Sequence, residues 1–87
     1  MSETMTDDLY RKILVALSTV ADRDLSHLTA ESSLDESGFD SLAFSQVVLH
    51  LESALAIEFP DAVLLELQEV RRVGDIYAVL KRTSPAL

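Results

Sequence analysis

The stretch GFDSLAFSQVVLHLESAL, residues 38–55, combines a helix start with an apolar run of helical period. Asp and Ser are preferred capping residues, so a helix is expected to begin near Asp40 or Ser41 and to end near Leu55. At about 100° per residue, one face collects the side chains expected in the core: Phe44, Val47, Val48, Leu51, Ala54 and Leu55. The opposite face collects Leu42, Gln46, Leu49 and Ser53. Leucines on a face that should meet solvent are the unusual feature of this helix.

An earlier helix is expected from about Thr6, which caps it, to Val20. Its apolar stripe comprises Leu9, Ile13, Ala16, Leu17 and Val20. Loop- and turn-forming residues then dominate the segment 21–39. A loop of this length is uncommon in so small a domain, so its leucines are expected to hold it against the core. These leucines are Leu25, Leu28 and Leu34.

Two further helices complete the expected fold. Pro60 favours a helix start, and a helix is predicted from Asp61 to about Val70. Gly74 and Asp75 introduce the last helix, whose buried stripe is Ile76, Val79 and Leu80. The predicted fold class is therefore all-α: a four-helix bundle with a long first loop and a short third helix.

The size of the chain favours one domain. With 87 residues, of which 48% are hydrophobic, a single folded domain over residues 1–87 is expected. About residues 6–82 should form the ordered core, with flexible termini. A domain of this size has no room for a deep catalytic cleft beside its core.

The charge balance limits the classes of partner. Lys and Arg total 7 against 15 Asp and Glu, which gives a formal net charge of −8. Such a surface repels nucleic acids and anionic membranes and attracts partners with basic patches. The chain has no cysteine, so disulfides and thiolate metal sites are excluded. No apolar run predicts a membrane span or a signal peptide, and a cytoplasmic protein is expected.

The two histidines do not predict a catalytic or metal site. A serine hydrolase would need a histidine beside Ser41, but His50 lies about two and a half helical turns further along the same expected helix. His27 falls in the long loop. Two separated histidines also make a poor metal site. We therefore expect no catalytic residue and no metal in this chain.

Helix capping alone would explain a lone Asp-Ser-Leu triplet. Here the triplet belongs to an ordered series: Gly38, Asp40, Ser41 and Leu42, then Glu52, then Ile57-Glu58-Phe59-Pro60-Asp61, and finally Val73-Gly74-Asp75. In this order and spacing the chain resembles the acyl and peptidyl carrier proteins over roughly residues 6–82.

The resemblance implies a function for Ser41. A phosphopantetheinyl transferase would attach 4′-phosphopantetheine from coenzyme A to this side chain, with Asp40 as part of the attachment site. The arm would hold acyl or aminoacyl cargo as a thioester, so the protein would be a carrier and not an enzyme. The implied partners are that transferase, a cargo-loading ligase or acyltransferase, and a downstream synthase or transferase. A monomer is expected.

The exposed helix face indicates the kind of carrier. Leu42, Gln46 and Leu49 are the expected partner-docking residues, and Gln46 stands where carriers of fatty acid synthesis usually place a glutamate. The stretch from Ser41 to Asp61 is also similar to discrete carriers loaded by amino acid:carrier protein ligases. Specialised metabolism is therefore favoured: polyketide synthesis, non-ribosomal peptide synthesis or aminoacyl transfer.

Several alternatives remain open at this point. Phe44 projects toward the core where fatty acyl carriers open a tunnel, so it either restricts the cargo to short or polar groups or is ordinary core packing. A carrier of fatty acid synthesis is a second candidate. A small acidic helical interaction module, without any prosthetic group, is a third. The chain could also be a free-standing protein or a domain of a larger synthase.

Overall fold

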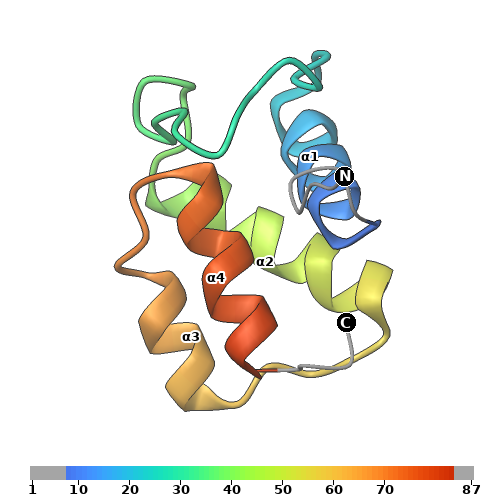
Figure 1. Ribbon diagram of the computed structural model, residues 1–87, viewed down its shortest axis with the longest axis vertical. Coiled ribbons are helices and arrows are strands. Elements are labelled where there is room, and N and C mark those ends of the chain that lie inside the picture. The colour runs from blue at the N-terminus through green and yellow to red at the C-terminus, as the bar shows by residue number, and fades with distance from the viewer. Residues whose placement is uncertain (1–7, 84–87) are drawn as a thin grey trace, which may run out of the picture.

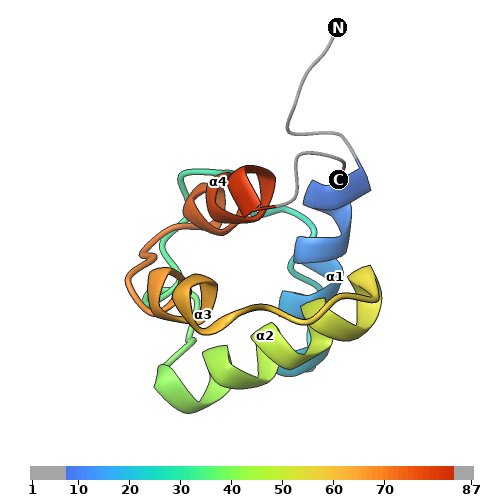
Figure 2. The ribbon, with the colours of Figure 1, turned by 90° about the horizontal axis from the view of Figure 1, so that it is seen from below.

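The computed structural model describes residues 8–83, in which four helices surround one core. They are α1 (Asp8–Ala21), α2 (Ser41–Leu55), α3 (Asp61–Leu67) and α4 (Val73–Thr83). Figure 1 shows α4 in front of α2, with α1 and α3 on either side, and Figure 2 shows the four helices around a common centre. The predicted all-α bundle with a long first loop and a short third helix is confirmed. The predicted cap Thr6 and residues 84–87 of the terminus that was predicted to be flexible lie outside the described residues.

The apolar stripes predicted from periodicity form the core. The largest side chains that are fully excluded from solvent are Ile13, Leu17, Leu25, Leu51, Leu67, Ile76, Leu80, Val47 and Val73. They come from all four helices and from the long first loop, so these segments share one core.

Helix α2 has the predicted bounds but one predicted core residue is wrong. Val47 and Leu51 are fully buried, while Phe44 is half-buried against the core. Ala54 is exposed. It lines a surface depression between α1 and α2 together with Val15.

Helix α3 ends at Leu67, before the predicted Val70. The following backbone turns more tightly, because Glu69 N–H donates to Glu66 O at 3.0 Å and Val70 N–H donates to Leu67 O at 3.3 Å. Hydrogen bonds between residues three positions apart, as in a 3-10 helix, tighten the last turn of a helix. Val70 nevertheless packs against the core, so its apolar character is explained without further helix.

The long first loop is part of the core, as its leucines predict. Leu25 and Leu34 are buried, and Leu28 packs against the core from a half-buried position. The loop is also bonded to the linker between α3 and α4, because Leu34 N–H donates to Arg71 O at 2.9 Å. These contacts make the loop a structural element that holds the start of α2 in place.

Gly74 lets α4 approach this loop closely. Its N–H donates to Ala30 O at 2.8 Å. A Cβ at position 74 would lie 3.0 Å from both the Cβ and the O of Ala30, closer than side chains normally pack. The close packing between the loop and α4 therefore favours glycine in Val73-Gly74-Asp75.

Candidate functional site

Ser41 is the first residue of α2, and the preceding residues fix it there. Gly38 has a φ of +97°, a backbone conformation that favours glycine. Phe39 is buried and anchors the end of the loop in the core. Asp40 then caps the helix, because its Oδ1 accepts the N–H of Ala43 at 2.8 Å. Asp40 therefore does the capping, and the Ser41 side chain does not.

The hydroxyl of Ser41 is exposed and makes no hydrogen bond within residues 8–83. Other serine hydroxyls of the domain are engaged by the backbone. Ser45 Oγ donates to Ser41 O at 3.0 Å, Ser37 Oγ donates to Ser33 O at 2.8 Å, and Ser18 Oγ accepts from Leu25 N–H at 2.9 Å. The unengaged hydroxyl at the start of α2 is thus accessible to a modifying enzyme.

The start of α2 also suits a phosphate group. The N–H groups of Ser41 and Leu42 belong to the first helical turn and have no acceptor among the described residues. Unpaired N–H groups and the helix dipole favour negative charge at this end. The carboxylate of Asp40 opposes this effect only in part, because its Oδ1 is bonded to Ala43 N–H. A phosphodiester on Ser41 Oγ therefore fits the residues present.

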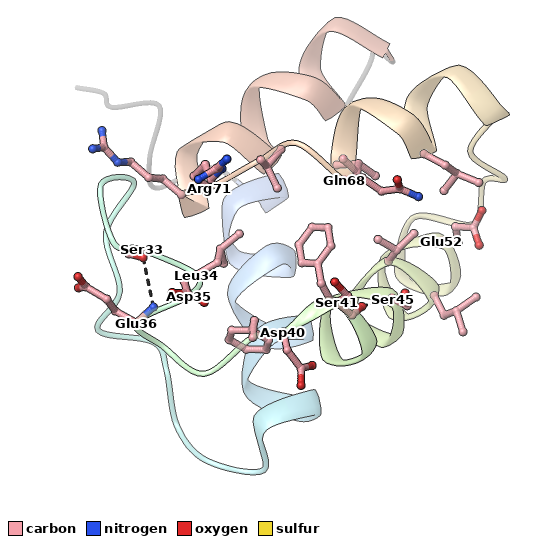
Figure 3. A pocket seen from close by; sticks show the side chains of 18 residues that line it. Ser33, Leu34, Asp35, Glu36, Asp40, Ser41, Ser45, Glu52, Gln68 and Arg71 are labelled. Carbon is pink, nitrogen blue, oxygen red and sulfur yellow. Dashed lines mark hydrogen bonds between the residues drawn. The ribbon is translucent and has the colours of Figure 1, made fainter.

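An open groove runs beside Ser41 between α2 and the segment that follows α3. Figure 3 shows Ser41, Ser45 and Glu52 along α2, with Gln68 and Arg71 on the opposite wall. The apolar side chains of the groove are Leu34, Phe39, Phe44, Val48, Leu49, Leu64, Leu67 and Val70. Its charged side chains are Asp35, Glu36, Asp40, Glu52, Arg71 and Arg72. The groove can accommodate a tethered chain that has both apolar and polar parts.

The structure places the expected docking residues on the outward face of α2. Leu42 is 71% exposed and Leu49 is 63% exposed, and Gln46 between them is also exposed. Leu49 in addition lines the groove. These three residues lie on the same helix as Ser41, so a partner that reads this face also reaches the groove.

The histidines lie away from this site. His50 lines the depression between α1 and α2, and His27 is exposed in the loop. Among residues 8–83, no group of three or more His, Cys, Asp or Glu side chains is placed to hold a metal ion. None of the described helices is long and apolar enough to cross a membrane.

The sequence analysis did not predict the residues that form the groove wall opposite α2. Gln68, Arg71 and Arg72 lie in the connection between α3 and α4, where helical periodicity carries no information. The only feature of the sequence that could have indicated these residues is the pair of adjacent arginines in an acidic chain.

The chain matches the family model described as "Phosphopantetheine attachment site" over residues 11–76. A search of curated proteins returned no match. The matched region covers most of α1, all of α2 and α3 and the start of α4, and it includes the whole first loop. The family carries 4′-phosphopantetheine covalently, and its members act as carriers that are generally non-catalytic. This chain is therefore a member of the phosphopantetheine-binding carrier protein family.

Proposed function

We propose that Ser41 is the attachment residue and that the chain carries cargo in specialised metabolism, in polyketide, non-ribosomal peptide or aminoacyl-transfer pathways. The observation that carries the attachment proposal is the exposed, unengaged Ser41 hydroxyl at the start of α2, beside the groove. When bound, the group supplies a terminal thiol that holds an acyl or aminoacyl cargo as a thioester.

The attachment step uses the hydroxyl of Ser41 as the nucleophile. Ser41 Oγ attacks the phosphorus of coenzyme A that bears the pantetheine, and a new O–P bond forms. The pyrophosphate P–O bond breaks, adenosine 3′,5′-bisphosphate leaves with the electron pair, and the hydroxyl proton passes to a base of the transferase. The N–H groups of Ser41 and Leu42 stabilise the phosphodiester charge that remains on the carrier.

Docking is proposed for the outward face of α2. Leu42 and Leu49 offer apolar area, while Gln46 adds a polar contact without charge. Acidic residues near Ser41, such as Asp35 and Glu36, attract basic partners electrostatically and so raise their rate of association. Apolar contact therefore contributes more of the affinity along α2, and charge contributes to the rate of encounter. The partners proposed are a phosphopantetheinyl transferase, a cargo-loading ligase or acyltransferase, and a downstream synthase or transferase.

Intact mass tests the attachment. The purified unmodified chain, incubated with coenzyme A and a broad-specificity phosphopantetheinyl transferase, is expected to gain one phosphopantetheine. Peptide mapping should locate the gain on the peptide that contains Ser41. A folded, unmodified sample that gains no mass with several transferases would contradict the proposal and favour the interaction-module alternative.

The cargo is proposed to be short or polar. Phe44 packs against the core and lines the groove, and its ring occupies space that a long acyl chain would need. An octanoyl chain loaded on the arm is therefore expected to leave the NMR signals of the buried Val47 and Leu51 methyl groups unchanged relative to the unloaded holo form. Large shifts confined to those core positions would mean that Phe44 moves aside and that long chains are sheltered, as a fatty acid carrier requires.

A further inference from the structure

Two arginines supply the positive charge of the groove beside Ser41. Arg71 and Arg72 are the only cationic side chains among the 18 that line it. They lie on the α3–α4 connection, across the groove from α2 (Figure 3). The whole chain holds 7 Lys and Arg against 15 acids, and the groove also holds the acids Asp35, Glu36, Asp40 and Glu52, so the two arginines are a local pair of positive charges in acidic surroundings.

The backbone under these arginines is firmly held. The N–H groups of Arg71 and Arg72 both donate to Asp75 Oδ2 at 3.1 Å. Arg71 O accepts from Leu34 N–H at 2.9 Å, and Arg72 forms an isolated antiparallel bridge with Ser33. These backbone contacts with α4 and with the first loop need not be rearranged when a ligand enters, because only the long side chains have to move. Both side chains line the groove from this fixed backbone, and both residues are exposed.

The two guanidinium groups themselves are not engaged. Neither Arg71 nor Arg72 makes a side-chain ion pair or hydrogen bond within residues 8–83, and both residues are exposed. Other guanidinium groups of the domain do have partners: Arg82 pairs with Glu66 at 2.8 Å, and Arg23 donates to Ser37 O at 2.6 Å. A guanidinium is a planar fork whose geometry matches a carboxylate in two parallel hydrogen bonds. The groove therefore offers two adjacent carboxylate-binding forks.

We propose that Arg71 and Arg72 bind the free carboxylate of a thioester-bound dicarboxylic acyl group. The inference rests on the proposed attachment at Ser41, which tethers the cargo by a flexible arm within reach of this groove. Tethering makes the contact intramolecular, so an exposed ion pair that is weak between free partners becomes populated. The hydrocarbon part of such a cargo contacts the apolar side chains of the groove, such as Phe44 and Val48, while its charged end reaches the arginines.

Matched acyl groups test this proposal. The unmodified chain is loaded from succinyl-coenzyme A or from butyryl-coenzyme A by a broad-specificity transferase, and intact mass verifies the loading. Butyryl has the same carbon chain but ends in a methyl group in place of the carboxylate. The succinyl form is expected to shift the side-chain Nε–Hε NMR signals of Arg71 and Arg72 relative to unloaded holo protein, and the butyryl form is not. High salt should remove the shift, because exposed ion pairs are screened.

Variants assign the effect to the two side chains. In the Arg71→Gln/Arg72→Gln double variant, the differences between the succinyl and butyryl forms at the Val48 and Leu64 methyl groups should disappear. Arg11→Gln, which removes an exposed arginine of α1 outside the groove, is the matched control and should retain them. Both sets of variants should fold, because the substituted side chains are exposed.

Three other outcomes are possible, and each would contradict a different part of the proposal. Nε–Hε signals that shift equally in the unloaded holo, butyryl and succinyl forms, relative to the unmodified chain, would mean that the arginines bind the phosphodiester of the arm and not the cargo. No shift in any form, with loading verified by mass, would overturn the carboxylate proposal and leave the attachment at Ser41 intact. No mass gain at all would overturn the attachment itself and the inference with it.

Discussion

The Ser41→Ala variant is expected to show no mass gain when it is incubated with coenzyme A and a phosphopantetheinyl transferase, while the wild-type chain gains one phosphopantetheine. The reason is chemical, since alanine has no oxygen to form the phosphodiester. All carrier function should be lost with it, because the thiol that holds the cargo belongs to the attached group. The measurement is the intact mass of both proteins under identical conditions.

This loss should occur without unfolding. Asp40 provides the capping hydrogen bond to Ala43 N–H, and the Ser41 hydroxyl is unengaged within the described residues. The free energy of unfolding should therefore change by no more than about 0.5 kcal/mol, as for other exposed substitutions. Ser45→Ala is the matched control: it lies one turn further along α2, loses its bond to Ser41 O, and should still be modified. A full mass gain in Ser41→Ala would assign the attachment to another residue.

Leu25→Ala is expected to lower the free energy of unfolding by about 2–5 kcal/mol, the range for a leucine removed from a protein core. Leu25 lies in the first loop, yet its side chain is only 1% exposed. Small domains are stabilised by roughly 5–15 kcal/mol, so a loss of this size would leave a marginal fold. Urea unfolding followed by circular dichroism measures the effect.

Leu65→Ala is the control for this prediction. It removes the same atoms from α3, but the Leu65 side chain is 63% exposed, so the cost should be below about 1 kcal/mol. If Leu25→Ala proved as mild as this control, the first loop would not be part of the cooperative core. The loop would then not be what holds Gly38, Phe39 and Asp40 in place before Ser41.

Local pattern was sufficient for much of the fold. The bounds of α2 were predictable because Asp40 is a strong cap and the apolar period begins immediately after it. Helix α4 was predictable from its apolar period, which puts Ile76, Val79 and Leu80 on one face. Ala54 and the end of α3 were predicted wrongly, since a helical wheel describes one helix and does not tell where a neighbouring helix stops covering it.

The candidate site was also predictable only in part from the sequence. The exposure of Leu42 and Leu49 follows from their angle on α2, and the position of Ser41 follows from the cap before it. Neither the angles of residues on α2 nor the cap before Ser41 predicts the groove. It requires the α3–α4 connection to pack beside the first loop, and that contact joins residues far apart in the chain, such as Leu34 and Arg71.

The sequence by itself determined the four helices, the core stripes, the exposed face of α2 and the place of Ser41 at its start. These features depend on residues close together in the chain, whose spacing sets their direction on a helix. Only the tertiary structure decided which segments the first loop contacts, that Gly74 lies close to Ala30, and that Arg71 and Arg72 line the groove beside Ser41. Those features depend on hydrogen bonds and packing between distant segments, which no local period encodes.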